Sequence, residues 1–209
     1  MFELGQIVAY VLVVAALFLV PGPAVLLTLA RSISGGVRVG VATGAGIAVG
    51  DALHTLMAVL GLSAILMTSA LAFDIVKYLG AAYLIYLGIR AFLEQSDAIH
   101  LPQVQRVTPL PAFRQAILTE VLNPKTALFF LSFLPQFVDP TRGAVWAQLL
   151  VLGAIFVVMS IAYTSLLALG AASVATWLTR HSMIGRWKGK FVGSIYLGLG
   201  VQLALQERR

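Results

Sequence analysis

Long uncharged apolar stretches, separated by short polar segments, organise the whole chain. The hydrocarbon core of a bilayer is about 30 Å thick, so a helix needs about 20 apolar residues to cross it. Residues 4–30 and 143–179 carry no charge at all. The pattern predicts six membrane-spanning helices, at about residues 4–30, 39–68, 72–93, 115–137, 146–173 and 190–205.

The composition agrees with a membrane protein. Of the 209 residues 60% are hydrophobic and 11% are charged, whereas soluble domains carry roughly 25% charged residues. The net charge is +6, but the basic residues border the apolar stretches, so we expect the lipid bilayer as a partner and no nucleic acid. The chain has no cysteine, which excludes disulfides and cysteine nucleophiles. Six helices leave only short loops, so function must reside within the bilayer.

Basic residues predict the orientation, because cytoplasmic loops are enriched in Lys and Arg. Loops one, three and five hold nine of the 14 basic residues, and the opposite side holds four. We therefore expect these three loops in the cytoplasm and both termini outside. If the first or the fourth stretch only re-enters the membrane, the number of crossings changes, and with it the side on which the later loops lie. The nine residues are Arg31, Arg38, Arg90, Arg106, Arg114, Arg180, Arg186, Lys188 and Lys190.

Two pairs of segments suggest an internal repeat. Residues 77–84 (KYLGAAYL) align with residues 190–197 (KFVGSIYL), and Pro21 aligns with Pro124. We interpret residues 1–97 and 114–209 as two three-helix halves joined by a cytoplasmic linker, 98–113, although chance similarity is the alternative. Because each half holds an odd number of spans, the second half crosses the membrane in the opposite orientation to the first. The expected fold is an all-α polytopic membrane protein of two inverted three-helix repeats, as in many secondary transporters.

Prolines interrupt the first and fourth predicted spans, at Pro21-Gly22-Pro23 and at Asn123-Pro124-Lys125. Proline removes a helix hydrogen bond, and an unpaired carbonyl in hydrocarbon must find another partner. We predict that both helices open here and that these six residues bind a substrate's ammonium and carboxylate. A tolerated kink is the alternative, since proline is commoner in membrane helices than in soluble ones.

Asp51 is the most informative buried charge, since it lies near the middle of the second predicted span. It could carry a proton during transport, and His54 shares its helix face. The alternative is a structural ion pair with Lys125. Glu120 and Gln136 are candidates for an ion pair or a gate, or for interfacial positions. Glycines at 40, 44, 46 and 50 predict close helix packing, within the chain or in a homodimer.

Several of these segments, in order, resemble the LysE/RhtB family of bacterial amino-acid exporters. They are Pro21-Gly22-Pro23, residues 31–40 (RSISGGVRVG), 44–51 (GAGIAVGD) and 77–84, Leu122-Asn123-Pro124-Lys125, and 133–137 (FLPQF). The resemblance implies a transporter of the bacterial inner membrane. It would export amino acids or related metabolites, driven by the proton gradient, without a cofactor. Alternating access around the two breaks is the expected mechanism.

Two other functions remain open. An intramembrane enzyme would need an acid pair, a metal cluster or a nucleophile with a base, and only Asp51 with Glu120 offers a pair. Export of a metal ion would need several intramembrane ligands. Asp51, His54 and Met57 are the only cluster, which is thin, so we expect no resident metal and no enzyme.

Overall fold

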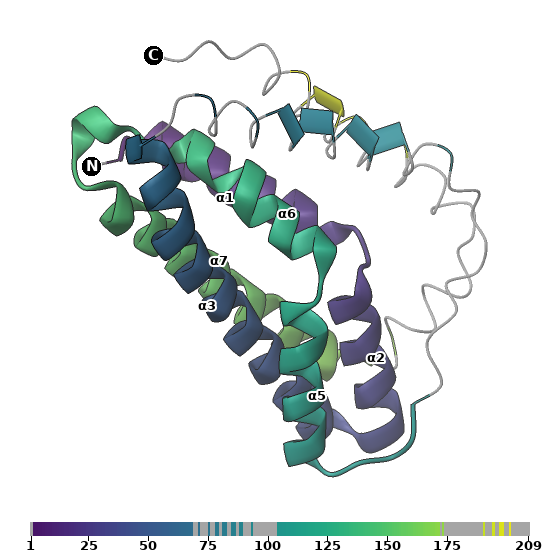
Figure 1. The fold of residues 1–209 in the computed structure, drawn as a ribbon. Helices are drawn as coiled ribbons and strands as arrows, with labels where there is room; N and C mark the ends of the chain where they lie inside the picture. Colours follow the sequence, from purple (N-terminus) through teal and green to yellow (C-terminus); the bar gives the residue numbers. More distant parts are fainter. Residues whose placement is uncertain are drawn as a thin grey trace.

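The computed structural model describes residues 2–68 and 104–171, with isolated positions between 71 and 93 and between 173 and 201. The described elements are all helical (Figure 1). They are α1 (Leu4–Leu19), α2 (Pro23–Gly35), α3 (Val37–Thr68), α5 (Pro109–Val121), α6 (Pro124–Ser132), the 3₁₀ turns η1 (Leu134–Phe137) and η2 (Pro140–Arg142), and α7 (Val145–Leu169).

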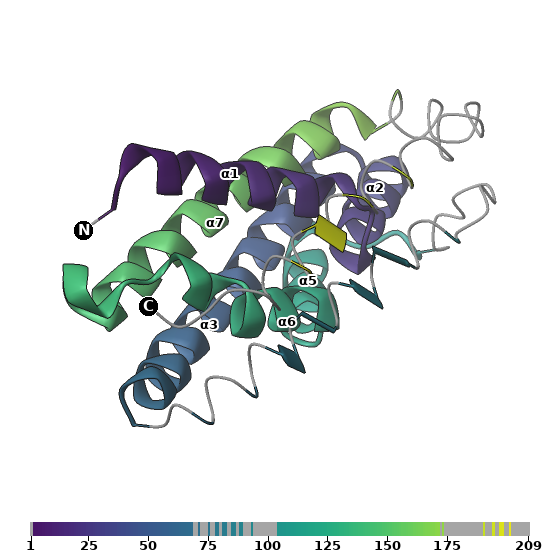
Figure 2. The same cartoon turned by 90° about the horizontal axis from the view of Figure 1, so that it is seen from above.

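Two of the apolar spans are straight and two are broken. Helices α3 and α7 are each long and apolar enough to cross a membrane. The pair α1 and α2 bends by 58°, and the pair formed by α5 with the segment Pro124–Phe137 bends by 49°. If each bent pair is one span, the described part of the chain holds four. These results confirm helices long enough for the second and fifth predicted spans, α3 and α7 (Figure 2), and the breaks in the first and fourth. Each bent pair is either one broken span or a re-entrant loop.

The predicted spans 72–93 and 190–205 lie largely outside the described residues. The count of six spans, the inverted repeat, the division into halves and the sidedness of the loops therefore stay predictions. Where the described parts correspond, the first and fourth spans share one design, in which a helix ends, a short extended segment follows, and a new helix starts with proline. Proline suits this position because its missing N–H would be unpaired there anyway.

Helix α3 is the centre of the described fold, and it makes its most extensive contacts with α5 and α7. Its glycines permit these contacts. A Cβ atom on Gly44 would lie 2.6 Å from the Thr164 hydroxyl of α7, and one on Gly46 would lie 2.8 Å from Ala116 Cβ of α5. The prediction of close packing is thus confirmed within the chain, with Gly40 facing both α2 and α7, Gly44 facing α7, and Gly46 and Gly50 facing α5.

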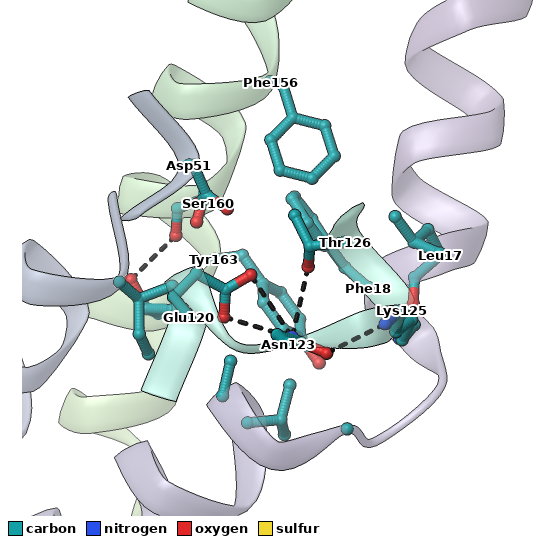
Figure 3. A pocket seen from close by; sticks show the side chains of 15 residues that line it. Leu17, Phe18, Asp51, Glu120, Asn123, Lys125, Thr126, Phe156, Ser160 and Tyr163 are labelled. Carbon is teal, nitrogen blue, oxygen red and sulfur yellow. Dashed lines mark hydrogen bonds between the residues drawn. The ribbon is translucent and has the colours of Figure 1, made fainter. Parts of the chain in front are cut away.

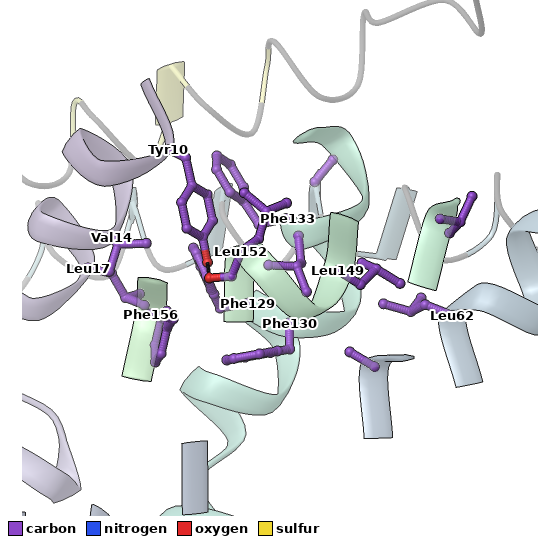
Figure 4. Packing of buried hydrophobic residues seen from close by; sticks show 14 residues of the cluster. Tyr10, Val14, Leu17, Leu62, Phe129, Phe130, Phe133, Leu149, Leu152 and Phe156 are labelled. Atoms are coloured by element: carbon purple, nitrogen blue, oxygen red, sulfur yellow. Dashed lines mark hydrogen bonds between the residues drawn. The ribbon is translucent and has the colours of Figure 1, made fainter. Parts of the chain in front are cut away.

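A cluster rich in aromatic side chains fills one end of the bundle, between α1, α6, α7 and the last turns of α3 (Figure 4). Phe129 and Phe133 stack at 5.4 Å between ring centroids, and Phe130 meets Phe156 edge-on at 4.9 Å. The Tyr10 hydroxyl donates a 3.0 Å hydrogen bond to the Leu152 carbonyl, which joins α1 to α7. Packing at the other end, around α2, rests on smaller aliphatic clusters.

Polar contacts tie the start of α1 to the turn before α7. Arg142 binds the Glu3 carboxylate at 2.6 Å and the Asp139 carboxylate at 3.0 Å. Hydrogen bonds from Thr141 hold the pKa of the exposed Asp139 carboxyl below its usual value. These exposed groups close the aromatic-rich end of the bundle outside the apolar spans.

Candidate functional site

A small cavity lies where the two helix breaks meet, and α1, α2, α3, α5, α6 and α7 contribute to its wall (Figure 3). Its volume is about 40 Å³, which is room for a few water molecules. Five of the predicted site residues line it, namely Gly22, Asp51, Glu120, Asn123 and Lys125. The other five, Pro21, Pro23, His54, Pro124 and Gln136, are not among the lining residues.

The break in the first span is completed by a side chain from the fourth. In an unbroken helix the Leu17 carbonyl would accept from residue 21, but Pro21 has no N–H. The Lys125 ammonium takes that place, donating to the Leu17 carbonyl at 2.7 Å and to the Val20 carbonyl at 2.8 Å. Two main-chain carbonyls beside the Pro21-Gly22-Pro23 motif thus hold Lys125, the one cation among the described residues that line the cavity. The Leu17 carbonyl also accepts from the Val20 main-chain N–H, at 3.3 Å.

The break in the fourth span is completed by a side chain of α3. Pro124 cannot donate to the Glu120 carbonyl four residues before it. His54 of α3 approaches that carbonyl at 2.9 Å through Nε2, and because a carbonyl oxygen only accepts, Nε2 carries the hydrogen. The Asn123 main-chain N–H also donates to this carbonyl, at 3.0 Å. The predicted proton-coupling residue His54 therefore has a defined structural contact in the wall behind the cavity.

We expect His54→Ala to lower the free energy of unfolding by about 1–3 kcal/mol, because a buried carbonyl loses a donor and the Phe130 ring loses its stacking partner. His54→Gln keeps a donor and should recover part of that loss. Thermal unfolding of the purified variants in detergent measures both. Equal melting temperatures for His54→Ala and the wild-type chain would contradict this structural role.

Two carboxyl groups share the cavity. Asp51 is 1% exposed and Glu120 is 2% exposed, and the Asp51 carboxyl faces both the Glu120 carboxyl and the Ser160 hydroxyl. Asn123 donates to the two oxygens of the Glu120 carboxyl at 3.2 Å each. Asp51 Oδ2 has no hydrogen-bond partner among the described residues. Since an unpaired buried carboxylate oxygen is costly, this atom needs a proton, a water or a ligand N–H.

The ion pairs of Lys125 with Asp51 or Glu120, which the sequence left open as alternatives, do not form in the described part of the chain. Among the described residues, neither Asp51 nor Glu120 lies within 4 Å of a basic group. Lys125 points instead to the carbonyls of α1, and Asn123 holds Glu120. The reason is the break itself, because its free carbonyls accept from Lys125 and no carboxylate is needed to hold that cation.

The rest of the wall is mainly apolar and aromatic. Phe18 stacks on Tyr163 at 5.4 Å and meets Phe156 edge-on at 5.1 Å. Leu17, Val25 and Ile47 complete the apolar part of the lining. Among the described residues that line it, the cavity thus presents one cation and two acids beside apolar side chains and the polar groups of Asn123, Thr126, Ser160 and Thr164.

Sequence reasoning missed Ser160, Thr164, Tyr163 and Thr126, which line the cavity. Ser160 and Thr164 are four residues apart in an otherwise apolar helix, and this spacing was the available signal. Gln136 lies away from the cavity and donates to the Ser132 carbonyl at 2.9 Å. That contact fits a cap at the end of α6, and no observation connects Gln136 to a gate.

Broken apolar helices around a buried charged cavity define a membrane transport protein. The chain belongs to the family described as LysE type translocator, whose model matches residues 15–207. This match confirms the family resemblance seen in the sequence. Translocators are transporters and not enzymes, as the sequence predicted.

Curated relatives cover nearly the full chain. An uncharacterized membrane protein of Pseudomonas aeruginosa is 36% identical over 200 residues, covering 93% of each chain. A leucine efflux protein of Salmonella typhimurium is 31% identical over 205 residues, covering 97% of each. An uncharacterized membrane protein of Vibrio cholerae is 32% identical over 200 residues. No solved structure matches the chain. Together these relatives indicate a multi-pass bacterial membrane protein.

Proposed function

We propose that this translocator exports neutral aliphatic α-amino acids from the cytoplasm in exchange for protons. The observation that carries the proposal is the cavity between the two breaks, where Lys125, Asp51 and Glu120 stand within an apolar wall. A zwitterion needs a cation for its carboxylate and acceptors for its ammonium, and the cavity offers both. The name of the leucine efflux relatives supports an aliphatic side chain.

Asp51 is the proposed proton carrier, because its Oδ2 atom is buried and unpaired beside a second carboxyl. A proton on Asp51 satisfies this atom in one half of the cycle. In the other half, the ionised Asp51 balances the positive charge of the substrate's ammonium in the same cavity, which makes the two events alternatives. Inward proton flow is thereby coupled to outward amino-acid flow.

Alternating access follows from the size of the cavity. About 40 Å³ holds a few waters, so an amino acid enters only when the bundle opens. We propose that the broken helices move against the straight helices α3 and α7, opening toward the cytoplasm and the outside in turn. On the expected topology, Arg31 and Arg114 mark the cytoplasmic end and the Glu3–Arg142 contact marks the outer end.

Transport by the purified protein in liposomes tests the function. With an acidic lumen and an alkaline exterior, we expect accumulation of labelled leucine that a protonophore abolishes. Unlabelled isoleucine and valine should compete, whereas lysine should not. Leucine accumulation no greater than in protein-free liposomes, or unaffected by the protonophore, would refute proton-coupled export of this class.

Export of a metal ion is the weaker alternative. It needs Asp51, His54 and Met57 to converge, but Asp51 and His54 are buried whereas Met57 is 52% exposed. The described residues also contain no group of three or more His, Asp or Glu side chains arranged to hold a metal ion. The geometry therefore favours an organic zwitterion.

A further inference from the structure

Lys125 makes contacts that are unusual for a cation in the interior of a membrane. Such cations usually pair with acids, yet among the described residues the Lys125 ammonium donates to two main-chain carbonyls, those of Leu17 and Val20. The aliphatic arm lies along the break, where a Cβ atom on Gly22 would stand 3.4 Å from Lys125 Cδ. The lysine arm is therefore fitted against the glycine of the opposite break.

The two carbonyls form a site for a primary ammonium. Both have lost their i+4 helix donors, Leu17 because residue 21 is proline and Val20 because Ala24 belongs to the next helix. The Leu17 carbonyl keeps a longer hydrogen bond, 3.3 Å, from the Val20 main-chain N–H. Their oxygens lie 2.7 and 2.8 Å from one nitrogen, which matches charge-assisted N–H···O bonds. Gly22 and Leu17 also line the cavity, so the site borders the space that a substrate would enter.

We propose that the Leu17 and Val20 carbonyls are the subsite for the substrate's α-ammonium, and that Lys125 occupies this subsite until the substrate replaces it. The displaced Lys125 then binds the substrate's carboxylate. The exchange conserves charge, since the zwitterion brings one ammonium for the carbonyls and one carboxylate for the freed lysine. The identity of the substrate rests on the proposed function, whereas the ammonium subsite does not.

Charge conservation predicts a specificity. An amine without a carboxylate would take the carbonyls and leave two cations in one buried cavity, with no substrate carboxylate to bind the displaced Lys125, which is costly. Wild-type protein should therefore bind leucine and discriminate against isopentylammonium, which is leucine without its carboxylate. Removing Lys125 should abolish the discrimination between leucine and isopentylammonium, because the two carbonyls are then vacant and no lysine cation is displaced.

Thermal unfolding in detergent tests the subsite directly. We expect isopentylammonium at tenfold excess over its Kd to raise the Tm of Lys125→Ala by roughly 3–6 °C. It should leave the wild-type Tm unchanged. Tetramethylammonium, which has the same charge but no N–H, should have no effect on either protein. Arg142→Ala is the matched control, because it removes a cation outside the cavity, and it should behave like wild type.

Lys125→Met serves as a second variant, because it keeps most of the apolar arm and should fold if Lys125→Ala does not. The proposal is overturned if isopentylammonium stabilises neither variant, if tetramethylammonium stabilises them equally, or if wild type responds to isopentylammonium as strongly as to leucine. If isopentylammonium stabilises the Lys125 variants but the protein does not export leucine, the ammonium subsite is supported and the proposed transport function is refuted. If the protein exports leucine but isopentylammonium does not stabilise the variants, the transport function is supported and the subsite is refuted.

Discussion

Replacing Asp51 by asparagine is expected to reduce proton-driven leucine accumulation to the level of protein-free liposomes. Asparagine has nearly the shape of a protonated aspartic acid but cannot release a proton. Asp51 is 1% exposed, and it stands between the Glu120 carboxyl and Ser160 in the wall of the cavity. A neutral residue there should still permit the helices to rearrange, so exchange of labelled for unlabelled leucine should persist.

The comparison of gradient-driven accumulation with exchange separates coupling from folding. A variant that had merely lost its fold would lose both activities. Asp139→Asn is the matched control, because it removes an exposed carboxylate outside the apolar spans, and it should retain both. Undiminished gradient-driven accumulation by Asp51→Asn would exclude Asp51 as the proton carrier.

Gly46→Ala is expected to be the most destabilising single-methyl change in α3. The added Cβ would lie 2.8 Å from Ala116 Cβ and would also meet the Phe113 carbonyl. Relief requires α3 and α5 to separate, because neither contact is with the end of a flexible side chain. Overpacking typically costs about 1–3 kcal/mol. We expect about 3 kcal/mol here, or a Tm lower by roughly 6–12 °C.

Gly61 supplies the control within the same helix. A Cβ on Gly61 meets nothing within 4 Å, so Gly61→Ala should be neutral or stabilising by up to about 1 kcal/mol through helix propensity. Thermal unfolding of both variants in the same detergent measures the difference. If Gly46→Ala unfolds at the wild-type temperature, α3 and α5 do not pack as closely as the structure shows.

The helix breaks were predictable because proline acts locally. A missing N–H at residues 21, 23 and 124 interrupts the helix ladder whatever surrounds it, and the structure has its bends there. The long apolar helices were predictable for a similar reason, because length and hydropathy alone decide whether a helix can cross a bilayer. The glycine spacing likewise indicated close packing, although it did not say which helix approaches which face.

The partners of the buried polar groups were not predictable. Lys125 was predicted to bind substrate, with an ion pair to Asp51 as the alternative, and it binds carbonyls more than 100 residues away in sequence. His54 was predicted to act with Asp51 in proton coupling, and its ring nitrogen Nε2 hydrogen-bonds to the Glu120 carbonyl. Ser160 was overlooked because a hydroxyl can satisfy itself within its own helix, and only the packing of α3 and α5 against α7 brings a carboxyl to face it.

The sequence by itself determined that this chain enters the membrane, where two of its spans must break, and to which family it belongs. These follow from composition, local backbone chemistry and ordered motifs. Only the tertiary structure decided that the breaks meet at one cavity and that each is completed by a side chain from outside its own span. Such pairings depend on how helices distant in sequence pack together, and packing places atoms to within a fraction of an ångström that no local pattern encodes.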